Sequence, residues 1–524
     1  MAIPSKVDSL KKICKSFNVS ICLQLIALLG VAIYLRQYLS NRSLWYDEAA
    51  VTLNIIRLSF ADFLVQPLPF YTQVASFGFL VIEKLMVLCW GTGEYALRLY
   101  PLLCGMGSMG LFYLILKKHI RKEFLPFGLL IFVITPSLVY YSSEVKPYIT
   151  DVFLSLAAYL LIPDVFFKDS RIVKVILISG ISALFVWLSF PVVFVLLGIS
   201  LTCLGHAILK RKWNSLLHGC ILIGSVLISF MLYKHFLLDH LAKVPENKVF
   251  WAEGYISLFN LKDWINVINA MIHYPLGVEF FSWMAGMFFI LGAYAFFKED
   301  RKSFSIFLLP VALMFLAAVL HIYSCQKRMV LFIVPVLLIV IFKGIELVSL
   351  KGGKLKWVIM TASIGLLFAG SAIKTWNNYK DPYREEIKDV LTYVQLHERP
   401  EDLLFLYSRS RPAFEYYVSR YGLSSMNRID GEASFVKLNQ KVLLRDMLKL
   451  KNAKRVWIIF SHGMGVNGQS DEKLILHYLH NSGARMIQQS VSKGASVYLF
   501  DLSNNSFVQQ QHQGFGVKKE LNFK

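Results

Sequence analysis

The sequence predicts a polytopic α-helical membrane protein that carries a soluble α/β domain after its last membrane helix. Hydrophobic residues make up 56% of the 524 residues, charged residues make up 17%, and the mean hydropathy is +0.52. These values lie outside the range of soluble globular domains. Apolar runs of about 20 residues, the length that crosses a hydrocarbon core, recur along the first 373 residues. The chain is therefore built mainly to fold in a bilayer.

We expect about eleven membrane-spanning helices. The predicted spans are residues 20–39, 99–116, 125–142, 148–167, 174–190, 192–209, 217–237, 281–297, 304–321, 329–347 and 356–373. Basic residues mark one side of the membrane, because Lys and Arg near span ends are retained in the cytoplasm. They lie before the first span, around residues 117–122 and 210–212, and again around 298–302 and 351–356. This alternation predicts a cytoplasmic N-terminus in the cytoplasmic (inner) membrane and an extracytoplasmic C-terminus.

Two long outer segments, 40–98 and 239–280, are too polar to read as further spans. Residues 50–65 place apolar side chains at helical spacing, which predicts an interfacial helix in the first outer loop. The apolar run 70–90 is interrupted by Gln73, Glu83 and Lys84. We expect that run to form an interfacial or re-entrant helix, because a span there would invert every later loop.

The chain is expected to divide into a membrane domain at 1–373, an extracytoplasmic α/β domain at 374–505 and a disordered tail at 506–524. Short buried runs at 402–408, 455–463 and 495–502 are typical of strands, and amphipathic stretches at 383–397 and 471–483 are typical of helices. The net charge of +21 lies largely in the predicted cytoplasmic loops, so it does not indicate nucleic-acid binding. The seven cysteines form no C-x-x-C pair, so no structural zinc site is predicted.

Asp47 and Glu48 follow the first span in the string "SLWYDEAAVT". A carboxylate at this place can accept a proton from an incoming hydroxyl or amine, or hold a divalent cation such as Mg or Mn against a phosphate. The alternative is a structural role, with Asp47 as the N-cap of a helix that begins at Ala49 and Glu48 in its first turn. The residues alone leave both readings open.

Further polar residues are predicted on the same side of the membrane. Basic residues are disfavoured there, so a retained set indicates an anionic ligand or carboxylate partners, although snorkelling to headgroups is the structural alternative. The candidates are Arg98 in "GEYALRLYP", Glu144, Lys146 and Tyr148 in "YYSSEVKPYITD", and Arg328 in "SCQKRMVLFIVP".

The order of these strings, with "QPLPFY" between the first two, resembles the bacterial GT-C membrane glycosyltransferases of the protein O-mannosyltransferase-like and aminoarabinose-transferase-like group. The resemblance covers the membrane part, and many bacterial members carry a similar α/β tail. It implies an inverting glycosyltransferase that moves a sugar from a polyprenyl-phosphate carrier to a lipid, glycan or protein acceptor at the outer face of the membrane.

The resemblance also implies roles for the candidate residues. Asp47 matches the first-loop Asp that acts as base or orients the acceptor, and Glu48 would support it or share a metal ion. Arg98, Lys146 and Arg328 match positions suited to neutralising the donor phosphate.

Two departures from the family pattern stand out. The chain has "QPLPFY" where the family commonly shows a His-Pro-Pro-Leu-Tyr-like string, and Arg328 lacks the Tyr that often follows it. The missing His weakens a metal assignment at that string. The rival functions are a transporter or flippase for lipid-linked sugars, which would place ionisable residues in the middle of spans, and a non-catalytic membrane subunit, which would tolerate Asp47→Asn.

Overall fold

The computed structural model describes residues 6–65, 67–167, 170–239, 252–278, 281–432, 440–463, 465–466 and 469–503. The chain forms two compact units. The first comprises Met1–Asn41 and Ile55–Pro382, and the second comprises Arg42–Asn54 and Tyr383–Lys524. A short piece of the first predicted outer loop therefore folds with the C-terminal domain. The predicted tail, 506–524, lies outside the described residues.

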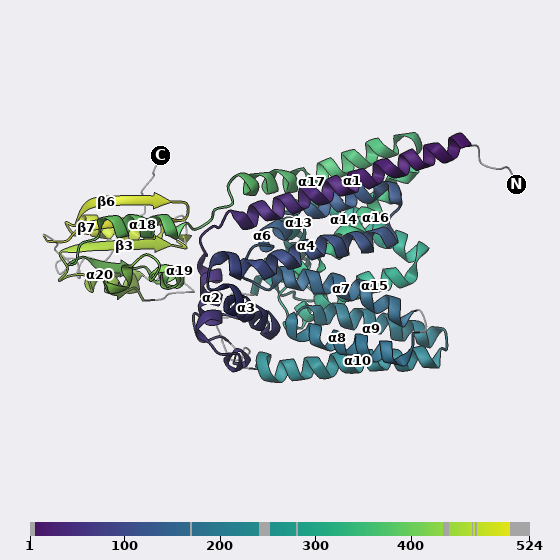
Figure 1. Cartoon of the computed structure of the whole chain (residues 1–524), viewed down its shortest axis with the longest axis horizontal. Helices are drawn as coiled ribbons and strands as arrows, with labels where there is room; N and C mark the ends of the chain where they lie inside the picture. The colour runs from purple at the N-terminus through teal and green to yellow at the C-terminus, as the bar shows by residue number, and fades with distance from the viewer. Residues whose placement is uncertain are drawn as a thin grey trace. The chain divides into compact units, whose positions relative to one another are not determined.

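The first unit is a helical bundle (Figure 1). Its α-helices are α1 (Lys6–Leu39), α3 (Phe77–Trp90), α4 (Glu94–His119), α5 (Leu125–Val133), α6 (Pro136–Tyr141), α7 (Tyr148–Phe166), α8 (Ile172–Leu188), α9 (Val192–Leu209), α10 (Trp213–Tyr233), α13 (Leu261–Leu276), α14 (Ser282–Glu299), α15 (Arg301–Val319), α16 (Val334–Lys351) and α17 (Lys356–Lys380). The 3₁₀ helices η1 (Ala61–Leu64) and η5 (Lys327–Ile333) precede α3 and α16.

Each predicted span coincides with a helix, except that 125–142 is split into α5 and α6 at Thr135 and Pro136. Within the described residues, eight helices are long and apolar enough to cross a membrane, and α8 is a shorter apolar helix. The predicted number of about eleven spans is not settled by this count. α3 has 14 residues, which reach about 21 Å and are too few for a hydrocarbon core of about 30 Å. The expectation that 70–90 does not span is consistent with this length.

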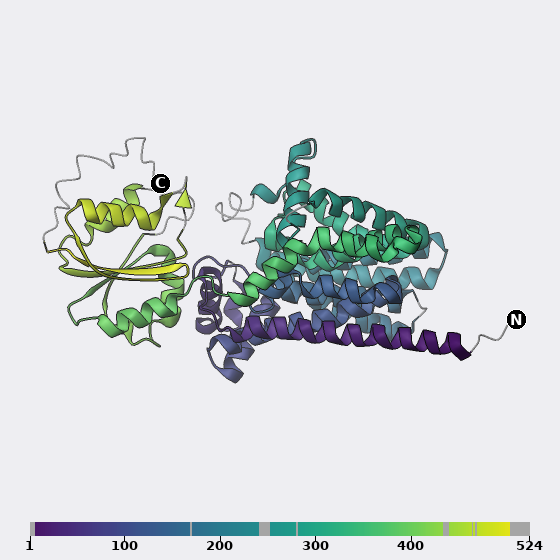
Figure 2. The same cartoon turned by 90° about the horizontal axis from the view of Figure 1, so that it is seen from above.

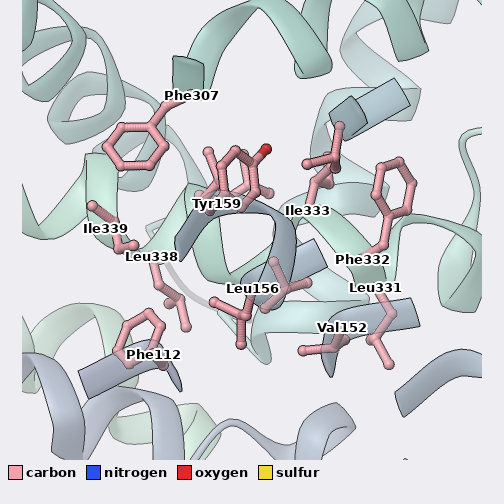
Figure 3. Close-up of a cluster of buried hydrophobic side chains, with 14 of the residues drawn as sticks. Phe112, Val152, Leu156, Tyr159, Phe307, Leu331, Phe332, Ile333, Leu338 and Ile339 are labelled. Carbon is pink, nitrogen blue, oxygen red and sulfur yellow. The ribbon is translucent and has the colours of Figure 1, made fainter. Parts of the chain in front are cut away.

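The core of the bundle surrounds α16, whose side chains are almost all buried. Figure 3 shows Phe112 of α4, Leu156 of α7 and Phe307 of α15 converging with residues of η5 and α16. Such a helix, apolar on all sides, is stable only when other helices cover it. It therefore fixes η5, and with it Arg328, at one end of the bundle.

The two ends of the bundle differ in chemistry. One end, which we call the Lys343 end, holds an ionic network in which the Lys343 ammonium lies 2.8 Å from Glu299 and 3.2 Å from Glu346, and Lys356 lies 3.2 Å from Glu123. The opposite end, which we call the Lys146 end, contains the turn between α6 and α7 and the start of η5.

The second unit is built on a five-stranded sheet, and Figure 2 shows helices on both of its faces. Its elements are the part of α2 (Tyr46–Arg57) up to Asn54, α18 (Ile387–His397), β1 (Leu403–Leu406), α19 (Arg411–Tyr417), β2 (Asn427–Asp430), α20 (Gln440–Leu448), β3 (Arg455–Ser461), α21 (Asp471–Asn481), β6 (Arg485–Ser492) and β7 (Ala495–Asp501), with a small hairpin of β4 (Gly465–Val466) and β5 (Gln469–Ser470).

The strand order is β2-β1-β3-β7-β6. β1 pairs in parallel with β2 and β3, with Leu403 opposite Val456, and β7 pairs antiparallel with β3 and β6. β3 and β7 are almost wholly buried, as their apolar runs predict. The expected soluble α/β domain is therefore confirmed.

Candidate functional site

Lys146 is held in a tight turn at the Lys146 end of the bundle. α6 ends at Tyr141 and α7 begins at Tyr148, and inside the turn the backbone N–H of Lys146 donates to the carbonyl of Glu144 at 2.7 Å. Lys146 is 4% exposed as a residue, and its ammonium donates to Oε1 of Gln73 at 2.8 Å. The turn therefore aims a nearly buried cation at a neutral side-chain oxygen.

Gln73 reaches Lys146 because the chain folds back on itself after the string "QPLPFY". The N–H of Leu68 donates to the carbonyl of Gln73 at 2.8 Å. Tyr71 and Thr72, between them, adopt φ values of 60° and 50°. Left-handed backbone is uncommon for such residues and needs support from its surroundings. The turn that follows this string thus brings Gln73 to Lys146.

Arg328 joins the same region from η5. Its guanidinium carbon lies 5.5 Å from the centre of the Tyr148 ring, within the range of a cation–π contact. The Tyr148 ring lies 5.1 Å from that of Tyr141, whose hydroxyl is 2.7 Å from the hydroxyl of Tyr274. Both Arg328 and the fully buried Glu144 act electrostatically on the Tyr141 hydroxyl.

The structure thus brings together four of the predicted residues, and we call them with Gln73 the Lys146 cluster. Its members are Gln73, Glu144, Lys146, Tyr148 and Arg328. Three separate segments supply them, so the cluster depends on the fold and not on one motif.

Arg98 lies in the first two turns of α4 and is 1% exposed. It acts electrostatically on the hydroxyl of Tyr38 at the end of α1, and this hydroxyl donates to the carbonyl of Tyr95 at 2.9 Å. Arg98 is therefore placed near the junction of α1 and α4.

Asp47 and Glu48 belong to the second unit. α2 begins at Tyr46, so both carboxylates lie in its first turn and Asp47 is not the N-cap. The N-cap alternative is therefore wrong in position, although acidic residues in a first turn still favour the helix dipole. Glu48 is fully buried and Asp47 is partly buried. Burial and the neighbouring Asp47 carboxylate raise the pKa of the Tyr46 hydroxyl.

The residues just before Asp47 contact the C-terminal domain through Glu385 and His462. The N–H of Tyr46 donates to Glu385 at 3.2 Å, and Nδ1 of His462 lies 2.7 Å from the other oxygen of the same carboxylate. Sequence reasoning missed Glu385, His462 and Gln73. Gln73 stands two residues after a string that was singled out, but no pattern in the sequence links Glu385 or His462 to Tyr46.

A cavity of about 840 Å³ lies beside the start of η5. Its polar lining includes Glu253, Ser257, Asp263, Asn266, His321 and Lys327. Hydrogen bonds from Ser257 hold the pKa of Asp263 below its usual range, so this carboxylate stays ionised. His321 and Lys327 adopt φ values of 58° and 48°, and the His321 ring stacks on Tyr255 at 5.1 Å.

Metal ligands do not gather in the part of the chain that the structure describes. No group of three or more His, Cys, Asp or Glu side chains there is arranged to hold a metal ion. The residues present therefore do not form a fitting metal site, and we assign no step to a metal.

Comparisons with known proteins find solved structures of similar fold. No protein-family model and no curated protein matches the chain. The crystal structure of apo ArnT from Cupriavidus metallidurans has a TM-score of 0.51 at 11% identity and covers 90% of this chain and 97% of that one. The same protein bound to undecaprenyl phosphate has a TM-score of 0.52, with the same identity and coverage. The Archaeoglobus fulgidus oligosaccharyltransferase, in complex with Zn and sulfate, has a TM-score of 0.48 at 12% identity, covering 83% of this chain and 67% of that one.

At such identities the likeness is one of fold. It extends over both units, since nine tenths of this chain is covered. The expected architecture is therefore confirmed: the chain has a bundle of helices, several of them long and apolar enough to cross a membrane, and a C-terminal α/β domain, in a fold similar to that of ArnT.

Proposed function

We propose that this chain is an inverting glycosyltransferase that moves a sugar from a polyprenyl-phosphate carrier to an acceptor at the outer face of the cytoplasmic membrane. The observation that carries the proposal is the Lys146 cluster, in which the ammonium of the buried Lys146 and the guanidinium of Arg328, which lies over the Tyr148 ring, belong to the same end of a GT-C fold. Cations in such surroundings bind phosphate more strongly than exposed cations do. The complex of ArnT with undecaprenyl phosphate supports a lipid phosphate as the carrier.

In the proposed reaction the oxygen of an acceptor attacks the anomeric carbon of the sugar from the face opposite the phosphate. The bond between that carbon and the phosphate oxygen breaks, and polyprenyl phosphate leaves with the bonding electrons. Lys146 and Arg328 stabilise the negative charge that develops on the leaving phosphate. Asp47 accepts the proton of the acceptor, and Glu48 supports its position. One displacement of this kind inverts the anomeric centre.

The acceptor is a lipid, a glycan or a protein, and the cavity beside η5 is the place we propose for its polar part. Glu253 and Asn266 line the cavity with groups that form hydrogen bonds to hydroxyls. Lys327 also lines the cavity, and Arg328 is the next residue in the sequence. An acceptor held there would lie beside the donor phosphate.

The transporter alternative predicts charges along the middle of the spans. In the described spans α4, α7, α9 and α15, charged side chains occur only within five residues of a helix end. Lys343 of α16 and Lys374 of α17 lie further from a helix end, and Lys343 is paired with Glu299 and Glu346. This distribution favours chemistry at the membrane surface over a charged path through the bundle.

The test is sugar transfer by the purified protein from a panel of radiolabelled polyprenyl-phosphate sugars, with a membrane extract as acceptor. We expect one donor to be consumed, and Asp47→Asn to reduce turnover by at least about a thousandfold, because a base with no replacement is lost. Asp62→Asn is the matched control, since Asp62 is an exposed acid of the same loop whose carboxylate accepts hydrogen bonds from Ser59. Consumption of no donor by folded protein would favour transport, and full activity of Asp47→Asn would remove the assigned base.

A further inference from the structure

The second unit holds a segment of the first outer loop at the place where sheets of its type usually bind a ligand. β1 lies between β2 and β3, and all three are parallel. After β1 the chain continues to β2 on one side of β1, and β3 is added later on the opposite side of β1. Open α/β sheets bind ligands at the carboxyl ends of two such strands. In this unit the residues after β1 and β3 face Tyr46.

The contacts at this edge are specific. His462 directly follows β3, and its ring stacks on the ring of Tyr46 with centres 5.0 Å apart and planes 22° from parallel. Arg409 and Arg411, which follow β1, act electrostatically on the Tyr46 hydroxyl. The two strand ends are joined to each other, because the N–H of Ser461 donates to Oγ of Ser410 at 2.7 Å.

Each residue from Ser43 to Tyr46 has a partner in the same unit. Oγ of Ser43 donates to Glu386 at 2.9 Å, and the N–H of Leu44 donates to the hydroxyl of Tyr417 at 2.9 Å. The guanidinium carbon of Arg384 lies 3.7 Å from the centre of the Trp45 ring. With the bond from Tyr46 to Glu385, four consecutive residues are held by backbone or side-chain contacts.

The partners are themselves fixed by the sheet. The N–H of Glu386 donates to the carbonyl of Lys493 at 2.8 Å, in the turn between β6 and β7. Gly494 follows with a φ of +70°, and a Cβ at this position would overlap the carbonyl oxygen of Arg384. The β6–β7 turn thus sets the position of the acidic pair Glu385 and Glu386, and a larger residue at Gly494 would displace it.

We propose that the carboxyl edge of β1 and β3 is an internal docking site whose occupant is the segment Ser43–Tyr46, and that this docking positions Asp47. Asp47 follows Tyr46 directly, in the first turn of the same helix. Glu385, Glu386 and His462 are then positioning residues that act through the docked segment. The second half of this inference rests on the proposed function of Asp47, whereas the docking itself does not.

The experiment measures docking and turnover separately in the full-length protein. Docking is read from tryptic cleavage after Arg42, which is 1% exposed and precedes the docked segment. Glu385→Ala removes the acceptor that joins Tyr46 to His462, so we expect cleavage after Arg42 to become at least tenfold faster. We also expect kcat to fall by about tenfold to a hundredfold, because small misplacements of a reacting group have effects of that size. The donor KM should stay within twofold.

Three further variants control the result. Glu385→Gln keeps an oxygen for the Tyr46 N–H and should restore both kcat and resistance to cleavage. Tyr417→Phe removes only the hydroxyl that binds Leu44, which gives a mild second variant if Glu385→Ala does not fold. Asp389→Asn is the matched control, because Asp389 is an exposed acid of the same domain whose carboxylate accepts a hydrogen bond from Ser492 at 2.7 Å.

Resistance to cleavage in Glu385→Ala and Tyr417→Phe would overturn the docking. Faster cleavage with an unchanged kcat would overturn the positioning role. Failure of the proposed function is recognised independently, because an active Asp47→Asn variant would refute the base while leaving the cleavage results as they are.

Discussion

At the scale of single residues, the contact between Arg328 and Tyr148 decides how the Lys146 cluster can bind phosphate. A guanidinium above an aromatic face keeps its N–H donors directed sideways and available for two parallel bonds to an anion. The 5.5 Å separation between Arg328 and the Tyr148 ring is compatible with that arrangement. An ammonium at the same place would keep the charge and lose the planar fork.

We therefore expect Arg328→Ala to raise the donor KM by about tenfold to a hundredfold, the usual loss for a charge-assisted pair. Arg328→Lys should give an intermediate KM. Tyr148→Phe is the control, because it keeps the ring and removes only the hydroxyl, and its KM should stay near that of the wild type. The measurement is initial rate against donor concentration in detergent. An unchanged KM in Arg328→Ala would separate Arg328 from donor binding.

Part of this site was predictable from sequence and part was not. Glu144, Lys146 and Tyr148 lie in one short string, and the basic residues of the set oppose the positive-inside trend, so both signals are local. The partners Gln73, Glu385 and His462 come from distant segments. Contacts between residues so far apart in the sequence form only in the completed fold. Neither the periodicity nor the composition of the sequence predicts such contacts. The positions of Asp47 and Glu48 relative to the membrane-domain residues stay predictions.

At the scale of elements, length and apolarity predicted nearly every helix of the bundle, because the bilayer demands both. The break between α5 and α6 was missed, although Pro136 stands at the first turn of α6, where proline is tolerated. β2 and β6 were missed for a different reason. They are the two edge strands of the sheet and are largely exposed, so they lack the apolar run that identified β1, β3 and β7.

Helix α3 carries an acidic residue whose effect on the stability of the folded protein depends on pH. Glu83 is fully buried, and neither of its carboxylate oxygens has a hydrogen-bond partner among the described residues. Burial raises the pKa of Glu83 well above its usual value. A group with a raised folded-state pKa stabilises the protein fully below its unfolded pKa and loses that contribution as the pH rises toward the folded value.

We expect Glu83→Gln to raise the free energy of unfolding by about 1–3 kcal/mol at pH 8, because the neutral amide replaces a carboxylate that burial penalises. The gain should shrink toward pH 5, where wild-type Glu83 is protonated. Thermal unfolding at both pH values measures it, with Asp62→Asn as an exposed control. An equal effect at both pH values would show that ionisation of Glu83 is not the cause.

The packing of α14 against α16 depends on two glycines. A Cβ at Gly292 would overlap the carbonyl oxygen of Val340, and a Cβ at Gly344 would overlap that of Phe288. Close approach of backbones through small residues is a common way for membrane helices to associate. Since α16 is the covered core helix, any separation of this pair would disturb η5 and Arg328.

Gly292→Ala should therefore lower the free energy of unfolding by about 1–3 kcal/mol, as overpacking of a core does. Gly286→Ala is the matched control on the same helix, because nothing lies within 4 Å of a Cβ there. The temperature at which each detergent-solubilised variant loses its monodisperse peak compares the two. Equal temperatures for Gly292→Ala and the wild type would contradict the tight packing.

At the scale of the whole molecule, the distribution of charge predicts which end of the bundle faces the cytoplasm. The Lys343 end carries the ionic network of Lys343 and Lys356 and the basic connections 117–122, 298–302 and 351–356. The Lys146 end carries the donor-binding cations of the proposed site. Nucleotide sugars are confined to the cytoplasm, so an enzyme that uses a lipid-linked sugar gains from placing its site at the opposite end.

This orientation is tested by single cysteines in a background without the seven native ones. Lys354→Cys reports on the Lys343 end, and Glu401→Cys reports on the exposed surface of the C-terminal domain beyond α17. In intact cells we expect a membrane-impermeant maleimide to label Glu401→Cys and to reach Lys354→Cys only after permeabilisation, because positive loops stay inside. Labelling of Lys354→Cys alone would invert the topology and place the Lys146 cluster in the cytoplasm. Labelling of both without permeabilisation would mean that α17 does not cross the bilayer.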